Sequence, residues 1–116
     1  MAEVTVYEKP TCTTCKNLAA LLADQGIAYD AVEYHVLGLT TDEVRDIVAK
    51  TGERPAALLR RRDPAYEELG VAGFEDDDER VIAAMVERPA LLQRPVVIRG
   101  DRAVLARPVE RALELF

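Results

Sequence analysis

The chain has 116 residues, a mass of 12.8 kDa and a formal net charge of −6. This length suffices for one domain with its own hydrophobic core, and the 49% hydrophobic and 31% charged residues are ordinary for a globular protein. The negative charge argues against non-specific binding to nucleic acid or anionic membranes, and no segment approaches the roughly 20 apolar residues of a membrane-spanning helix.

Cysteine usage indicates the compartment. Cys12 and Cys15 are too few for a secreted domain held together by disulfides. The segment that begins at Met1 has no basic region followed by an apolar stretch, so no secretory signal is expected. We therefore expect a cytoplasmic protein, in which a Cys-x-x-Cys pair serves redox chemistry or metal binding rather than a permanent disulfide.

The first secondary-structure elements surround the two cysteines. Residues 3–7 predict a strand, because Val4 to Tyr7 are β-branched or aromatic, and Pro10 follows it. A helix is expected from about residue 13 to 24, ending before Gly26. Cys12 then lies at the helix N-terminus, where backbone N–H groups carry partial positive charge and favour a thiolate. Because the thiolate is the form that attacks, we expect chemistry at this point.

The next segments complete one supersecondary unit and begin another region. Residues 27–34 predict a second strand, with Ile27, Tyr29 and Ala31 on one face. Strand, helix and strand within about 30 residues predict a βαβ unit with parallel strands. From about residue 40 to 90 the pattern is helical throughout, beginning at Thr40, a good N-cap.

The last quarter of the chain predicts a hairpin and a closing helix. Residues 96–98 and 102–105 are apolar strands joined by a turn at 99–101. Pro108 suits the first turn of a helix over 109–115. The order predicts a single α/β domain, residues 1–116, with a helical insert at about 40–90 between the two halves of a small sheet.

A family resemblance rests on five stretches spread over nearly the whole chain: Lys9 to Asn17, Ala57 to Arg60, Tyr66 to Gly70, Arg94 to Val97, and Arg107-Pro108. The order of elements resembles the thioredoxin fold. The stretches resemble the ArsC family, the arsenate reductases that take electrons from glutathione and glutaredoxin. That family also contains the Spx-type transcriptional regulators.

The resemblance implies a site and a reaction. Cys12 occupies the position of the catalytic cysteine, and Arg60, Arg94 and Arg107 match three arginines that bind the oxyanion. Pro95 is implied to be a cis-proline. The implied activity is reduction of arsenate to arsenite, with glutathione or another low-molecular-weight thiol as co-substrate and glutaredoxin or a thioredoxin-type protein as reductant. We expect a monomer with no bound cofactor.

The arginines suit this chemistry because arsenate is mostly a dianion near neutral pH, and an attacking thiolate adds a second negative centre. Guanidinium groups offer forked donors that fit tetrahedral oxyanions, and they keep their charge at any working pH. They also favour the thiolate form of a neighbouring cysteine. In the implied route Cys12 attacks arsenic, glutathione attacks the adduct, arsenite leaves, and glutaredoxin reduces the mixed disulfide.

Two departures from the pattern leave alternatives open. Glu8 stands where these reductases often have a histidine, and a carboxylate there opposes ionisation of a thiol. Cys15 is a thiol at a position where they usually have none; it is a possible resolving or redox partner of Cys12. The pair also matches the switch of Spx-type regulators, so the alternative is a redox-sensing regulator that binds RNA polymerase. A general thiol–disulfide or deglutathionylating enzyme is a third hypothesis.

Other residues are interpreted structurally. One cysteine pair and the distant His35 are too few ligands for zinc, so no metal site is expected. The acidic run 76–79 is interpreted as charge at a helix N-terminus. Arg61 and Arg62 are interpreted as solvated charges. The phosphatase-like class of arsenate reductase is excluded, because its loop needs an arginine where this chain has Leu18.

Overall fold

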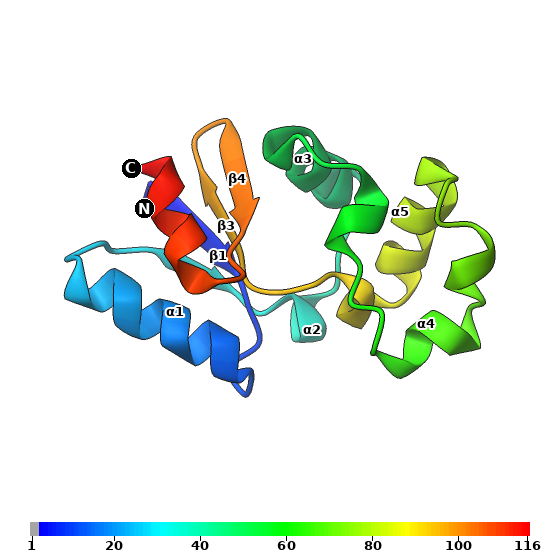
Figure 1. Cartoon of the computed structure of the whole chain (residues 1–116), viewed down its shortest axis with the longest axis horizontal. Coiled ribbons are helices and arrows are strands. Elements are labelled where there is room, and N and C mark those ends of the chain that lie inside the picture. The colour runs from blue at the N-terminus through cyan, green and yellow to red at the C-terminus, as the bar shows by residue number, and fades with distance from the viewer. Residues whose placement is uncertain (1–2) are drawn as a thin grey trace. The chain divides into compact units, whose positions relative to one another are not determined.

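The computed structural model describes residues 3–116; Met1 and Ala2, the first residues of the predicted domain, lie outside that range. Within it, one mixed sheet has the order β2-β1-β3-β4, with β2 parallel to β1 and the other neighbours antiparallel (Figure 1). The strands are β1 (Val4–Tyr7), β2 (Asp30–Val32), β3 (Val96–Arg99) and β4 (Arg102–Leu105). No helix among the described residues is long and apolar enough to cross a bilayer.

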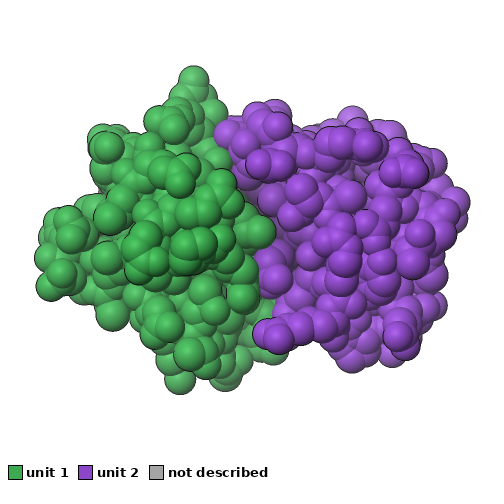
Figure 2. Space-filling model, in the orientation of Figure 1, with its two compact units in different colours: residues 1–37, 94–116 green, residues 38–93 purple. Residues whose placement is uncertain are grey.

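The described chain divides into two compact units, coloured separately in Figure 2. The first comprises the residues up to 37 and from 94 onward, and the second comprises residues 38–93. The helices of the first unit are α1 (Thr13–Asp24), α2 (Tyr34–Leu37) and the 3₁₀ helix η4 (Val109–Leu115). Those of the second are α3 (Thr41–Thr51), η1 (Pro55–Leu58), α4 (Pro64–Glu68), η2 (Val71–Gly73), α5 (Asp78–Glu87) and η3 (Pro89–Leu91).

The first unit has its core between one face of the sheet and the helices α1 and η4, which lie side by side on that face (Figure 1). Alternation along β1 directs Val4 and Val6 to this face, and the i, i+4 spacing of Leu18 and Leu22 directs one side of α1 toward them. This strand–helix–strand unit followed by a hairpin and a helix is the thioredoxin-like fold that the order of elements predicts.

The second strand is shorter than predicted. Only Asp30–Val32 pair with β1, and their side chains are exposed or half-buried. Ile27 and Tyr29 pack against the core from the loop before β2, which explains the apolar alternation without a paired strand. Tyr34, predicted to end this strand, instead begins α2 and is completely buried. His35 is exposed in the same short helix.

The second unit is helical, as predicted for residues 40–90. Thr40 forms a reciprocal capping box with Glu43: each side chain accepts the other residue's backbone N–H, at 3.1 and 3.0 Å. Helix α3 ends at Gly52, whose φ of 71° is a left-handed conformation that favours glycine. Asp77 caps α5, and α5 packs against α3. The helical pattern and its caps therefore determine this unit locally.

Candidate active site

Strand register brings three distant segments to one end of the sheet. Tyr7, the last residue of β1, lies opposite Val96, the first of β3, and Val96 lies opposite Leu105 at the end of β4. The segments that follow β1, precede β3 and follow β4 therefore meet at that end. They carry Cys12, Arg94 and Arg107 respectively.

Cys12 is the N-cap residue of α1. Its backbone is extended (φ −79°, ψ 124°), its N–H donates to the Lys9 carbonyl at 2.9 Å, and its carbonyl accepts the N–H of Lys16 at 3.0 Å. The first turn of the helix contains no acidic residue, so nothing there cancels the positive end of the helix dipole. The side chain is half-buried, and thus open to a substrate.

The two thiols have opposite electrostatic environments, although both are free. Burial acts to raise the pKa of Cys12, but the backbone amide of Cys15, the Cys15 thiol and the Arg94 guanidinium stabilise the thiolate and lower that pKa below its ordinary value. Cys15 is only 2% exposed, and its burial raises its pKa to about 12. A hydrogen bond with the Lys9 backbone acts to lower this pKa, whereas Cys12 and Glu8 act to raise it. These surroundings favour the thiolate form at Cys12 and the thiol form at Cys15, as the prediction of Cys12 as the nucleophile requires.

Arg94 is the most buried charged side chain of the described residues, at 7% exposure. It directly precedes Pro95, and the peptide bond between them is cis, the geometry that the resemblance implies. Burial acts to lower the pKa of Arg94, but the Tyr34 hydroxyl and the Cys12 sulfur, which accept its hydrogen bonds, raise it. A buried guanidinium that keeps its charge is thus held against the Cys12 sulfur.

Arg107 approaches the same sulfur from the other strand of the hairpin. Its Nε donates to the Arg94 carbonyl oxygen at 2.7 Å, and its Nη2 lies 3.9 Å from Sγ of Cys12. The peptide bond between Arg107 and Pro108 is also cis, which the sequence analysis did not foresee. Two guanidinium groups held in this way provide donors for an anion next to Cys12.

Tyr34 is a site residue that the sequence analysis missed. The ring centroid of Tyr34 lies 6.3 Å from that of Tyr7. Burial raises the pKa of the Tyr34 hydroxyl to about 12, although the hydrogen bond and the charge of Arg94 act to lower this pKa. Its hydroxyl thus orients the guanidinium that contacts Cys12. No sequence pattern marks it. In the strand predicted for residues 27–34, the alternation that puts Ile27, Tyr29 and Ala31 on one face puts Tyr34 on the opposite face.

The Glu8 carboxylate contributes to the electrostatic environment of Cys15. Burial and repulsion by Glu33 raise the pKa of the Glu8 carboxyl. Glu8 in turn contributes to the raised pKa of Cys15 and of Tyr29. The carboxylate that stands here in place of a histidine therefore contributes to the raised pKa of Cys15.

Arg60, the third predicted anion ligand, belongs to the second unit. Its Nη1 lies 3.0 Å from the Asp63 carboxylate, and its backbone N–H donates to the Leu91 carbonyl at 2.7 Å. Its role at the anion remains a prediction. Among residues 3–116, no three His, Cys, Asp or Glu side chains are grouped as metal ligands.

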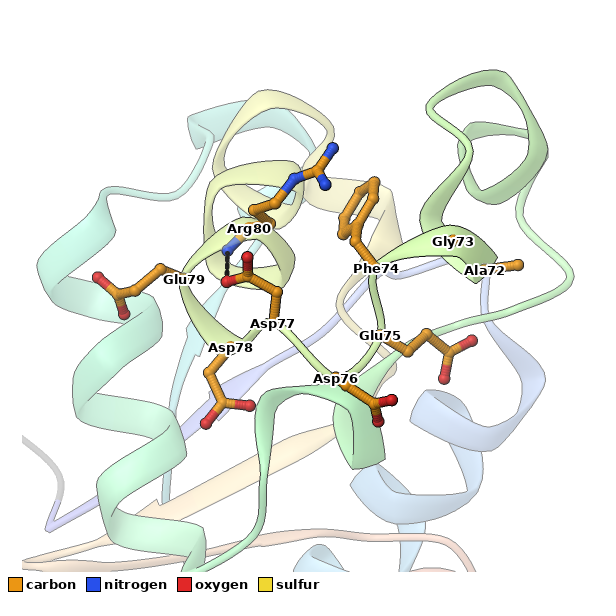
Figure 3. A pocket seen from close by; sticks show the side chains of 9 residues that line it. All are labelled: Ala72, Gly73, Phe74, Glu75, Asp76, Asp77, Asp78, Glu79 and Arg80. Carbon is orange, nitrogen blue, oxygen red and sulfur yellow. Dashed lines mark hydrogen bonds between the residues drawn. The ribbon is translucent and has the colours of Figure 1, made fainter.

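A surface hollow of about 670 Å³ lies in the second unit, lined by residues 72–80 (Figure 3). Arg80 stacks on the Phe74 ring with its guanidinium carbon 4.3 Å from the ring centroid. Two carboxylates that line the hollow have hydrogen-bond partners: Asp77 accepts the Arg80 backbone N–H, and Glu75 accepts hydrogen bonds from the side chains of Arg61 and Tyr66. Arg61, interpreted from the sequence as a solvated charge, is thus also an ion-pair partner of Glu75.

Two ion pairs hold Asp78 and Glu79, from Arg54 to Asp78 at 2.8 Å and from Arg45 to Glu79. Arg54 also donates to the backbone carbonyl of Asp76 at 3.0 Å. With Asp77 as N-cap, these contacts support the interpretation of the acidic run as charge at the start of α5.

The fold and the site define a class: a thioredoxin-like protein with a cysteine at a helix N-terminus, in surroundings that favour its thiolate form, and with arginines beside it. The comparisons specify the family. The model of the ArsC family matches residues 7–115, and the chain belongs to that family.

Individual relatives agree with this assignment. An arsenate reductase from Yersinia enterocolitica is 35% identical over 116 residues, which cover 100% of this chain and 82% of that protein. An arsenate reductase from Neisseria meningitidis is 32% identical, with 95% of each chain covered. The structure of an arsenate reductase from Vibrio cholerae matches with a TM-score of 0.91 and 31% identity, covering 97% of each chain.

Proposed function

We propose that this protein is an arsenate reductase that reduces arsenate to arsenite through the Cys12 thiolate. The single observation that carries the proposal is the placement of a stabilised thiolate against two arginines, Arg94 and Arg107, in a chain whose relatives are named arsenate reductases. Two guanidiniums next to a nucleophile attract a small oxyanion and place it for attack.

The reaction proceeds in steps that balance. The Cys12 sulfur forms a bond to arsenic, and one arsenate oxygen leaves as water after protonation. A second thiol then attacks the Cys12 sulfur, the sulfur–arsenic bond breaks, and its electron pair stays on arsenic. Arsenic is thereby reduced from the pentavalent to the trivalent state, and the two sulfurs are oxidised to a disulfide.

The arginines have separate roles in this route. Arg94 is buried and held by Tyr34, so it keeps a fixed position as charge develops. Arg107 is half-buried and reaches over the sulfur toward the incoming anion. Arg60 is proposed as the third ligand on the strength of the family resemblance.

The reductant is proposed to be glutathione or a similar low-molecular-weight thiol, coupled to glutaredoxin or a thioredoxin-type protein. The half-buried Cys12 is accessible to a small thiol, whereas Cys15 is shielded. The cycle requires Cys12 to start reduced, which the cytoplasm favours.

An arsenate-dependent NADPH oxidation assay with glutathione, glutaredoxin and glutathione reductase tests this proposal. The wild type is expected to turn over, Cys12→Ser to be inactive, and Arg107→Gln and Arg60→Gln to lose about 10²- to 10³-fold in turnover, the loss typical of one anion-stabilising donor. Arg102→Gln, which removes an exposed arginine of β4, is the matched control and should retain activity. No arsenate-dependent turnover with any thiol system overturns the proposal.

A second candidate function, a redox-sensing regulator that binds RNA polymerase, is favoured by the direct contact between the Cys12 and Cys15 thiols. Co-purification with RNA polymerase under oxidising and reducing conditions tests it. Absence of the complex in both states removes this candidate.

A further inference from the structure

The backbone of Arg60, the proposed third ligand of the oxyanion, is anchored within the second unit. Its N–H donates to the Leu91 carbonyl at 2.7 Å, and the residue before it, Leu59, forms an antiparallel β-bridge with Leu92. Leu59 and Leu92 are both buried, so this pairing is shielded from water. The bridge fixes the main chain at Arg60, but it does not fix the long side chain, which has several rotatable bonds.

The side chain of Arg60 is oriented by Asp63. The guanidinium Nη1 donates to Oδ2 of Asp63 at 3.0 Å, and the Asp63 backbone N–H donates to the Arg60 carbonyl at 3.1 Å. The two side chains are only 21% and 11% exposed, so solvent screens this ion pair less than a pair on the open surface. The contact therefore gives the guanidinium one preferred direction.

Asp63 is itself held in place, because it is the N-cap residue of α4. Its Oδ1 accepts the Ala65 backbone N–H at 2.9 Å, and its carbonyl accepts the N–H of Tyr66 at 2.9 Å. One carboxylate oxygen thus caps the helix while the other binds Arg60. A carboxylate with both oxygens engaged has little freedom to rotate, so it is a rigid support for the arginine.

We propose that Asp63 is the positioning residue of Arg60 in the oxyanion site. This inference deepens the proposed function and rests on it, because the ligand that Asp63 orients is part of that function. A guanidinium has several N–H donors in one planar fork, and those on Nε and Nη2 point in other directions than the bond to Asp63. An arginine that is already oriented loses less conformational entropy when it binds arsenate.

Removal of Asp63 has two opposite effects on the binding of an anion. It frees the Arg60 side chain, which weakens binding, and it removes a negative charge, which strengthens binding. Salt screens the effect of the charge and leaves the effect of orientation in place. At about 0.5 M salt the screening length is roughly 4 Å, so we expect orientation to decide the sign.

Two substitutions of Asp63 separate its contact with Arg60 from its cap on α4. Asp63→Ser keeps a cap, because the serine hydroxyl accepts the Ala65 N–H, but it has no carboxylate for Arg60. Asp63→Glu keeps a carboxylate within reach of Arg60 but is a poorer cap. Asp63→Asn, whose single oxygen cannot serve both partners, repeats the test of Asp63→Ser. Glu67→Gln removes an exposed carboxylate of the same helix and is the control for charge alone.

The measurement is protection of Cys12 by arsenate against iodoacetamide, a neutral reagent, followed by mass spectrometry at about 0.5 M salt. Arg60→Gln should raise the half-protecting arsenate concentration by at least about tenfold, because it removes a charged donor. Asp63→Ser and Asp63→Asn should raise it about two- to tenfold, the range for ordering one long side chain on binding. Asp63→Glu and Glu67→Gln should change it by less than about twofold.

Unfolding in urea and a double variant exclude a merely structural role. Asp63→Ser should unfold at nearly the wild-type urea concentration and Asp63→Glu at a lower one, the reverse of their order in arsenate binding. In Arg60→Gln, the additional Asp63→Ser substitution should change protection by less than about twofold, because its effect passes through the arginine.

The outcomes separate this inference from the proposed function. Unchanged or stronger protection in Asp63→Ser overturns the inference, as does an unchanged value in Arg60→Gln or a further loss in the double variant. None of these results touches arsenate reduction through Cys12. The expected pattern of protection without arsenate turnover in any thiol system overturns the proposed function and leaves the positioning of Arg60 by Asp63 in place.

Discussion

Arg107 provides a measurable test of anion attraction at Cys12. Its Nη2 lies 3.9 Å from the Cys12 sulfur, so an anion bound there would lie about as close to the guanidinium. Two unit charges at that separation interact by about 4 kcal/mol at an effective dielectric constant of about 20. Because Arg107 is half-exposed, solvent screening reduces this to about 1–2 kcal/mol, equivalent to roughly five- to thirtyfold in rate.

The assay compares alkylation of Cys12 by iodoacetate, an anion, and by iodoacetamide, its neutral analogue. Both reagents respond equally to the nucleophilicity of the sulfur, so their rate ratio isolates attraction of the anion. In Arg107→Gln we expect the ratio to fall about five- to thirtyfold, and the difference from the wild type to shrink at high salt. Arg102→Gln, an equal change of charge on β4, should alter the ratio by less than about twofold.

A ratio unchanged in Arg107→Gln would refute the reasoning, because the guanidinium would then exert no attraction at the reacting centre. An equal slowing with both reagents would show that Arg107 acts on the thiolate alone.

Three further predictions concern pH and stability. The rate of Cys12 alkylation should rise with pH with a midpoint below the ordinary thiol pKa of about 8.5, while Cys15 stays unlabelled in the native protein until the pH approaches about 12. Equal labelling of both thiols at neutral pH would contradict the assigned difference between their pKa values. Tyr34→Phe should lower the free energy of unfolding in urea by about 1–3 kcal/mol, because it removes the hydroxyl that accepts a hydrogen bond from buried Arg94; unaltered stability would exclude that bond as a significant contributor. Thr40→Ala should cost about 1 kcal/mol in the same measurement through loss of the α3 capping box, and a value near zero would show that the cap contributes nothing.

Local chemistry made much of the fold predictable from the sequence. The limits of α1 follow from the loop before Cys12 and from Gly26 after the helix, and the predicted helix over 13–24 is confirmed. Thr40 and Gly52 delimit α3 in the same way. The hairpin turn around Gly100 and the parallel pairing of β1 with β2 are likewise confirmed. These features depend on residues close together in the chain.

The second strand and the closing helix show where local patterns were insufficient. Ile27 and Tyr29 alternate because they pack against the core, not because they pair in the sheet, so the predicted strand was too long. The helix after Pro108 is 3₁₀ rather than α, a difference of hydrogen-bond register that composition does not specify.

The βαβ start, the helical insert and the candidate site residues follow from the sequence alone, since these depend on local propensity and on motifs. Which of these residues lie close together depends on the tertiary structure. Antiparallel register places Arg94 and Arg107 at the same end of the hairpin, next to Cys12. Burial distinguishes two thiols that look equivalent in Cys-x-x-Cys, because it raises the pKa of Cys15 while the surroundings of Cys12 lower its pKa. Burial and charge at a site are sums over residues distant in the chain, and only the folded protein brings those residues together.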